Sequence, residues 1–155
     1  MTLLKAKRAV ITGGAQGLGA ALAERLLREG ARVLIADIQE AQIAATVARL
    51  KPAYGESVSS RTCNVTAEPE VAALVAEARR RLGGLDVFVA NAAILVSGAI
   101  TEFDVAQWRR VLDVNLVGQM ICMSSPLVTF RAVWALPSLC PAGTGCPVSR
   151  TVTSC

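Results

Sequence analysis

The sequence predicts an α/β fold with a doubly wound parallel sheet that is truncated after about four strands. Short apolar runs alternate along the chain with longer segments in which apolar residues recur every three or four positions. The apolar runs do not alternate with polar residues, which is typical of parallel strands covered on both faces. The chain has 155 residues, of which 53% are hydrophobic and 18% charged, so one domain with a substantial core is expected.

The first strand and helix are expected between residues 8 and 30. Residues 8–12 have the composition of a short buried strand. Gly30 should end the following helix, because glycine adopts the left-handed conformation of a helix C-terminus at little cost. The predicted buried stripe of this helix contains Leu18, Leu22 and Leu26, widened by Ala21, Ala23 and Leu27.

A second strand and helix should follow directly. Residues 32–37 form an apolar run that ends in Asp37, and Ile43, Val47 and Leu50 mark the buried side of the next helix. Lys51-Pro52 should end that helix, because proline lacks the backbone N–H that a helix interior requires.

The third and fourth pairs complete the predicted sheet. A weaker strand is expected within 58–65, and Thr66 should be the N-cap of the third helix, which Gly83-Gly84 ends. Residues 85–91 should form the fourth strand. The expected buried stripes are Val71, Leu74, Val75, Ala78 and Leu82 in the third helix, and Val105, Trp108, Val111, Leu112 and Leu116 in the fourth.

The composition changes near Ser124, which divides the chain into residues 1–123 and a tail of residues 124–155. No acidic residue occurs after Asp113, and the stretch from Pro126 onward carries only two charges, Arg131 and Arg150, among four prolines. We expect this tail to be divergent and irregular. Two interpretations stay open: unrelated sequence joined to the domain, or a genuine tail with a binding role of its own.

Charge and composition exclude several classes of function. The net charge of +4 is modest, and the densest basic run, Arg79-Arg80-Arg81, falls where a helix should end and suits the helix dipole, so no nucleic-acid partner is expected. No signal peptide is visible, and the apolar stretch 116–130 is too short to span a membrane, so we expect a cytoplasmic protein. Five cysteines without a CxxC pair, and no histidine, predict no metal site.

Two features point to a dinucleotide ligand. The glycines within residues 13–19 follow a strand and open a helix, where unpaired N–H groups and the helix dipole suit a diphosphate. Asp37 ends the second strand, where a carboxylate accepts hydrogen bonds from the hydroxyls of an adenosine ribose. Neither Gln16 nor Ile38 supplies a cation for a 2′-phosphate, which favours NAD over NADP. A plain glycine-rich turn, and an Asp that caps the next helix, are the alternatives.

The spacing of the glycines resembles the cofactor loop of the short-chain dehydrogenase/reductase family. Thr12-Gly13-x-x-x-Gly17-x-Gly19 matches the family pattern TGxxxGxG, whereas the generic GxGxxG spacing is absent. Asn64-Val65 is similar to the Asp-Val pair that lies near the adenine in the family, and residues 89–94 resemble its NNAG segment.

This resemblance covers about residues 5–123 and implies a Rossmann-type sheet that binds NAD. The cofactor contacts that it implies are Thr12, Gly13, Gln16, Gly17, Leu18, Gly19, Asp37, Asn64, Val65, Asn91, Ala92 and Ala93.

Asn115 is the candidate residue for the family's chemistry. It lies three and four positions after Leu112 and Val111, so it should face inward, where an unsatisfied amide costs about 1–3 kcal/mol. Asn115-Leu116-Val117-Gly118 resembles the segment in which the family's asparagine holds a water that links the catalytic lysine to a proton relay. A buried asparagine that only satisfies the helix backbone is the alternative.

The rest of the family's catalytic machinery has no counterpart in the sequence. The resemblance implies hydride transfer between nicotinamide and an alcohol or carbonyl carbon, with a serine and a tyrosine that a lysine four positions later activates. Tyr54 is the one tyrosine, and Val58 follows it at that spacing. We therefore expect an NAD-dependent oxidoreductase that is truncated and has a small-molecule substrate only if a complete active site exists. A non-catalytic nucleotide-binding or dimer-interaction protein, or an inert truncation product, are the alternatives.

An open sheet edge predicts association between copies. The family places another parallel strand beside the fourth, and without it an apolar edge is exposed to pairing with other chains. A homo-oligomer or a self-associating protein is therefore expected.

Overall fold

The computed structural model describes residues 4–97, 101 and 104–127, and its centre is a four-stranded sheet in the order β3-β2-β1-β4. The paired strands are all parallel, with Arg8 opposite Arg32, Val33 opposite Val58 and Ala9 opposite Val87. The strands are β1 (Arg8–Thr12), β2 (Arg32–Asp37), β3 (Val58–Thr62) and β4 (Val87–Val89). The predicted parallel α/β sheet is thus confirmed.

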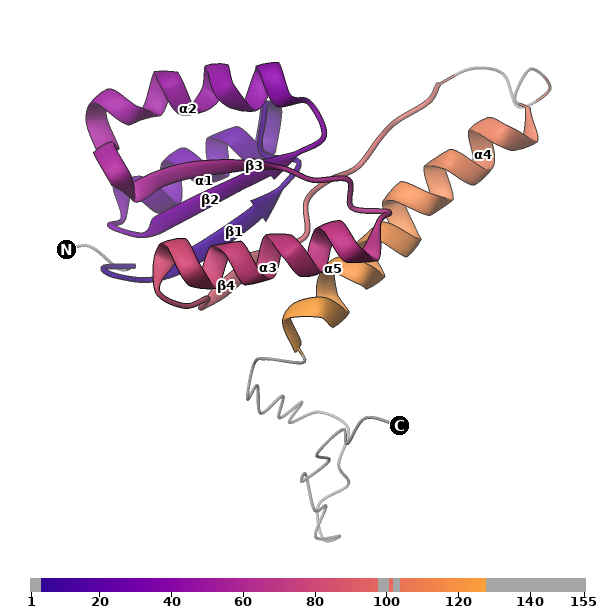
Figure 1. The fold of residues 1–155 in the computed structure, drawn as a ribbon. Helices are drawn as coiled ribbons and strands as arrows, with labels where there is room; N and C mark the ends of the chain where they lie inside the picture. The colour runs from indigo at the N-terminus through magenta and orange to yellow at the C-terminus, as the bar shows by residue number, and fades with distance from the viewer. Residues whose placement is uncertain (1–3, 98–100, 102–103, 128–155) are drawn as a thin grey trace, which may run out of the picture.

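Helices cover both faces of this sheet (Figure 1). Helices α1 and α2 lie on one face and α3 and α5 on the other, while α4 projects beyond the sheet (Figure 1). The helices are α1 (Gly17–Arg28), α2 (Glu40–Tyr54), the short 3-10 turn η1 (Gly55–Ser57), α3 (Glu68–Leu82), α4 (Val105–Leu112), the π-helical turn η3 (Asp113–Val117) and α5 (Gly118–Leu127).

Each central strand contributes to two hydrophobic clusters, because successive side chains of a strand point to opposite faces. In β1, Val10 belongs to the cluster beneath α3, whereas Ala9 and Ile11 belong to the cluster beneath α1 and α2. This burial on both faces explains why the strands are continuous apolar runs in the sequence.

The buried side of α1 differs from the predicted one. Leu18 is 76% exposed, and the buried residues are Gly19, Ala20, Ala23 and Leu27. Small residues at three of these positions, Gly19, Ala20 and Ala23, let the helix lie close to the turn after β1, and the large Leu18 is turned outward. The predictions of Leu18 and Ala21 as buried residues are therefore wrong, although Leu22 and Leu26 pack against the cluster at partial burial.

Two predicted helix ends are also corrected. Helix α2 continues through Pro52 to Tyr54, because the carbonyl that loses its N–H partner belongs to the exposed Ala48 and can be hydrated. The N-cap of α3 is Ala67 rather than Thr66, whose hydroxyl is instead hydrogen-bonded to Asn64 Oδ1 at 2.9 Å. Gly83 ends α3 as predicted, and it has a left-handed conformation.

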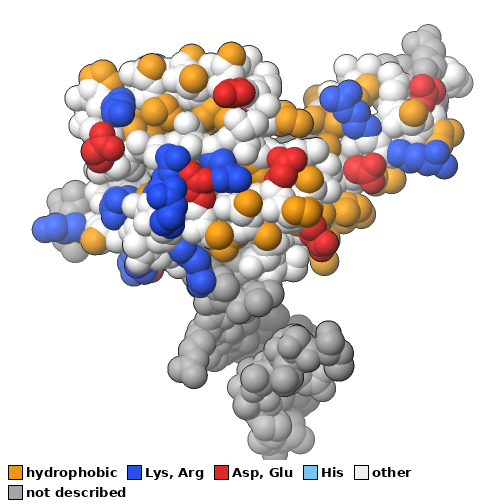
Figure 2. Space-filling model, in the orientation of Figure 1, with side chains coloured by type: hydrophobic (Ala, Val, Ile, Leu, Met, Phe, Trp, Pro, Cys, Tyr) orange, Lys and Arg blue, Asp and Glu red, His pale blue; other side chains and the backbone are white. Residues whose placement is uncertain are grey.

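Helix α4 has no buried residue, in contrast to the predicted buried stripe. Val105 and Leu112 are 63% and 52% exposed, and Trp108 and Leu116 are also exposed. Because α4 leaves the sheet, its apolar side does not reach the core, and Figure 2 shows hydrophobic side chains at the surface of this projecting part.

The predicted tail of residues 124–155 lies mostly outside the described residues, and its first positions belong to α5, which runs to Leu127. Within the part of the chain that the structure describes, no helix is both long enough and apolar enough to cross a membrane.

Candidate functional site

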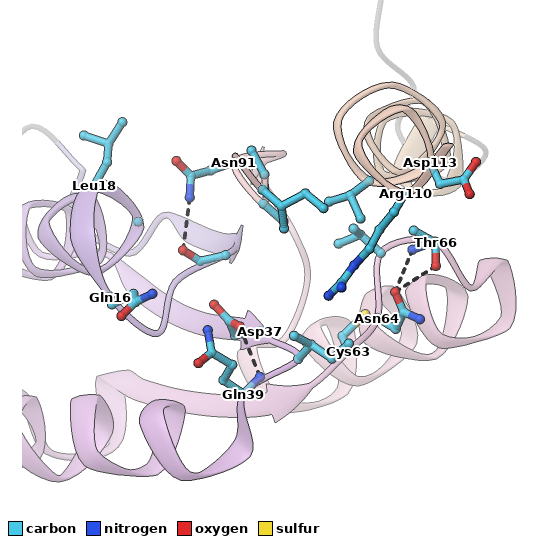
Figure 3. A pocket seen from close by; sticks show the side chains of 18 of the residues that line it. Gln16, Leu18, Asp37, Gln39, Cys63, Asn64, Thr66, Asn91, Arg110 and Asp113 are labelled. Atoms are coloured by element: carbon cyan, nitrogen blue, oxygen red, sulfur yellow. Dashed lines mark hydrogen bonds between the residues drawn. The ribbon is translucent and has the colours of Figure 1, made fainter. Parts of the chain in front are cut away.

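A pocket of about 670 Å³ opens at the carboxyl ends of the strands (Figure 3). The carboxyl end of each strand or the segment after it contributes to the wall: Gly13 after β1, Asp37 at the end of β2, Asn64 after β3 and Asn91 after β4. The strand order reverses beside β1, since β2 and β3 lie on one side of it and β4 on the other. Such a switch point is where open α/β sheets bind ligands.

The glycines allow a turn that no larger residue fits. Gly13 has φ +65°, and a Cβ added to it would lie 2.6 Å from the Cα of Ala92. A Cβ on Gly19 would collide with the carbonyl oxygen of Gly13 and lie 2.7 Å from Asn91 Nδ2. These contacts bring the start of α1 against the end of β4, so the backbone itself forms the floor of the pocket.

The N-terminus of α1 presents the positive end of its helix dipole to this pocket. Its N-cap, Gln16, makes no side-chain capping bond, and the first turn contains no acidic residue. Gln16, Leu18 and Gly19 line the pocket, so N–H groups that the helix cannot pair lie at its wall. The arrangement suits an anion.

Asp37 is held in place by two backbone groups. Its Oδ2 accepts a hydrogen bond from the N–H of Ala15 at 3.1 Å, and its Oδ1 accepts one from the N–H of Gln39 at 3.1 Å. The carboxylate thus joins the turn after β1 to Gln39, the N-cap of α2. Each oxygen retains lone pairs, so the same group can accept hydrogen bonds from hydroxyls in the pocket.

The segment after β3 forms a third wall. Asn64 Oδ1 accepts hydrogen bonds from the N–H of Thr66 at 3.1 Å and from its hydroxyl, so Asn64 closes a short turn as well as facing the pocket. Cys63, beside it, is 2% exposed, and burial raises the pKa of its thiol to about 11. Cys63 is therefore protonated at neutral pH and is a poor nucleophile.

Thr12 and Asn91 hold the ends of β1 and β4 together. The Thr12 hydroxyl accepts hydrogen bonds from the N–H groups of Asn91 at 3.1 Å and Ala92 at 3.2 Å. Asn91 Nδ2 donates in return to the carbonyl oxygens of Thr12 at 3.0 Å and Gly13 at 3.1 Å. Thr12 itself is buried behind the pocket, so it positions the wall, whereas Asn91, Ala92 and Ala93 line it.

Asn115 lies in η3 and is exposed, which corrects the prediction that it faces inward. Its side chain nevertheless has partners, because Oδ1 accepts from the N–H of Ile94 at 2.9 Å and Nδ2 donates to the carbonyl of Ile94 at 2.8 Å. The residue fixes the strand-like segment after β4, and a π-helical turn is a common feature of functional sites.

The structure brings together most of the predicted contacts. Those that line the pocket are Gly13, Gln16, Leu18, Gly19, Asp37, Asn64, Val65, Asn91, Ala92 and Ala93. Three predicted residues do not line the pocket: Thr12, Asn115 and Gly17, which is the first residue of α1. Tyr54, at the far end of α2, packs against the core cluster and is also absent from the lining.

Sequence reasoning missed the wall that α4 and η3 provide. Ala106, Arg109, Arg110, Asp113 and Val114 line the pocket, as do Ile38 and Gln39. Ala106, Arg109 and Arg110 are spaced so that they share one side of α4, away from its apolar stripe. This spacing was the signal from which a shared surface could have been predicted. The sequence does not indicate that this helix lies beside the carboxyl ends of the strands.

The chain matches known proteins over most of its length. The family model described as short chain dehydrogenase matches residues 7–132. A cis-4-hydroxycyclohexanecarboxylate dehydrogenase from Sinomonas cyclohexanicum is 47% identical over 116 residues, covering 74% of this chain and 45% of the relative. Momilactone A synthase from Oryza sativa subsp. japonica is 45% identical over 122 residues, covering 76% and 43%.

Solved structures agree with these matches. A short chain dehydrogenase from Mycobacterium smegmatis superposes with a TM-score of 0.77 at 33% identity, covering 82% of this chain and 53% of that one. The chain spans about half the length of the curated relatives that it matches. The parallel sheet, the glycine turn and these matches together show that the chain belongs to the short chain dehydrogenase family.

Proposed function

We propose that the chain binds NAD and represents the cofactor-binding part of an oxidoreductase that transfers hydride between nicotinamide and an alcohol or carbonyl carbon. The observation that carries this proposal is the pocket that joins Gly13, Gly19 and Asp37 at the switch point of the sheet. The nicotinamide ring would supply the hydride chemistry when bound. The chain's own residues would hold the diphosphate at the start of α1 and the ribose hydroxyls at Asp37.

NAD is favoured over NADP by the position of Asp37. Its carboxylate faces the pocket and is fixed by the N–H groups of Ala15 and Gln39, so it cannot easily turn away from a 2′-phosphate. The neighbouring residues Ile38 and Gln39 are uncharged and would not offset the repulsion between two negative groups.

Proton transfer to the substrate oxygen needs residues that this chain does not supply. The sequence contains no Tyr-x-x-x-Lys pattern, and Tyr54 is not among the residues that line the pocket. We therefore propose that these 155 residues bind the cofactor without turning over substrate. We also propose a cytoplasmic location.

Calorimetric titration of the full chain with NAD tests the proposal. We expect NAD and ADP-ribose to bind and Asp37→Ala to weaken both by at least about tenfold, because the substitution removes a charged acceptor worth more than 1.4 kcal/mol. Glu56→Ala, which removes an equal charge from a side chain that is 93% exposed, should bind as the unaltered chain does. Absence of binding by the unaltered chain would overturn the proposal. Turnover of NADH with a panel of carbonyl compounds would contradict the statement on catalysis.

A second candidate, self-association, is favoured by the exposed apolar stripe. It runs from α4 into α5 and comprises Val105, Trp108, Leu112, Leu116, Val117, Met120 and Met123. We propose that a second copy of the chain covers it. Light scattering should show a dimer or larger species that Leu112→Glu with Leu116→Glu dissociates and that the exposed Ala21→Glu leaves intact. A monodisperse monomer at high concentration would exclude this candidate.

A further inference from the structure

Arg110 reaches the pocket from α4, a helix that sequence reasoning did not connect with the ligand. It follows Ala106 by one helical turn and precedes Val114 by another, so the three lie on one side of the helix and line the pocket together. In Figure 3 its side chain extends toward the space between Asp37 and Asn64, with the guanidinium at the tip.

This guanidinium has no partner within residues 4–97, 101 and 104–127. Other arginines there are engaged, such as Arg8 with Asp86 at 2.7 Å and Arg49 with Glu24 at 2.8 Å, whereas Arg109, which also lines the pocket, has no partner in the described part of the chain. Both oxygens of Asp37 accept backbone N–H groups instead. A cation that extends over a pocket without a counterion is a group available to a ligand.

The remaining walls indicate which part of the ligand Arg110 meets. According to the proposed function, the diphosphate lies at the start of α1 and the ribose hydroxyls lie at Asp37. The flat base that follows the ribose must then lie toward Asn64 and Val65, which form the wall after β3. In Figure 3 Arg110 reaches this part of the pocket from α4, with its tip toward Asn64 and away from Gln16 at the start of α1.

We propose that Arg110 covers the adenine of the bound dinucleotide, with its guanidinium against the face of the ring. This inference rests on the proposed function. A guanidinium is planar, always charged and weakly hydrated, so it stacks on aromatic faces at little desolvation cost. A lysine at this position would supply the positive charge but not the planar group that stacks on a ring.

Calorimetry with ligand fragments tests the assignment. Arg110→Met keeps much of the side-chain length and removes the guanidinium. It should weaken AMP, ADP-ribose and NAD by similar factors of about two to five, which correspond to 0.5–1 kcal/mol at an exposed site. Nicotinamide mononucleotide, which has a phosphate but no adenine, should bind with unchanged affinity. Arg110→Lys should recover only part of the loss.

Controls separate this inference from the function on which it rests. Arg28→Met removes the same charge at the end of α1, outside the pocket, and should leave all four affinities unchanged. If the unaltered chain binds no ADP-ribose, the proposed function fails. If it binds and Arg110→Met changes nothing, or weakens nicotinamide mononucleotide as much as AMP, only the adenine assignment is overturned. A loss greater for NADP than for NAD would also overturn it, because Arg110 would then serve the 2′-phosphate.

Discussion

Replacing Thr12 by valine removes a hydroxyl at the junction of β1 and β4 while keeping the shape of the side chain. Thr12 is 1% exposed, and its oxygen accepts the N–H groups of Asn91 and Ala92 at 3.1 and 3.2 Å. Each lost hydrogen bond costs about 0.5–1.5 kcal/mol net, so Thr12→Val should lower the free energy of unfolding by about 1–3 kcal/mol. Because Asn91 and Ala92 line the pocket, their displacement should also weaken NAD binding.

Thr12→Ser is the matched control, since it keeps the hydroxyl and loses one methyl group. It should cost about 1 kcal/mol of stability and leave NAD affinity close to that of the unaltered chain. Urea denaturation gives the stability and calorimetry the affinity, both on the full chain. If Thr12→Val were as stable as the unaltered chain, or if Thr12→Ser lost as much affinity as Thr12→Val, the hydroxyl would not be holding the pocket wall.

Three further outcomes are expected. Gly19→Ala should abolish ADP-ribose binding by calorimetry, because its Cβ would collide with a backbone carbonyl, and retained affinity would contradict the close approach. Arg8 hydrogen-bonds to Asp86 and lowers the pKa of that carboxyl from 3.8 to about 2, so the ionised form stabilises the fold and this contribution is lost as the pH falls between those values. Urea titrations of Asp86→Asn should therefore show a weaker acid dependence than the unaltered chain, and identical curves would argue against it. Burial raises the pKa of Cys63 and Cys122 to about 11, so peptide mapping should find both unmodified by a thiol reagent at pH 7.5 until urea is added.

Most of the fold was predicted from the spacing of apolar residues within short segments of the sequence. The strand 8–12 and the stripe of α3 follow from apolar runs and helical spacing, which report burial directly. The turn at Gly13 and the carboxylate of Asp37 were predicted as ligand contacts because glycines at a helix start suit a diphosphate and a strand-end acid suits ribose hydroxyls. Both residues line the same pocket, and their roles as cofactor contacts stay predictions.

The failures concern contacts between distant segments. Burial of α4 was inferred from its apolar spacing, but spacing shows only that a helix has an apolar side and does not identify what covers it. Arg110 was missed for the same reason, because its place at the pocket depends on how α4 crosses the sheet end. The exposure of Leu18 follows from the small size of Gly19, which brings the helix against the preceding turn rather than the core.

An NMR titration of the isotope-labelled full chain with ADP-ribose tests the central claim most directly. If the pocket at the switch point binds the dinucleotide, amide shifts should change in residues 13–19, at Asp37, at Asn64 and in residues 91–94, and stay constant at the opposite ends of the strands. Saturation without shifts in residues 13–19, or shifts confined to another surface, would contradict the assignment of this pocket as the cofactor site.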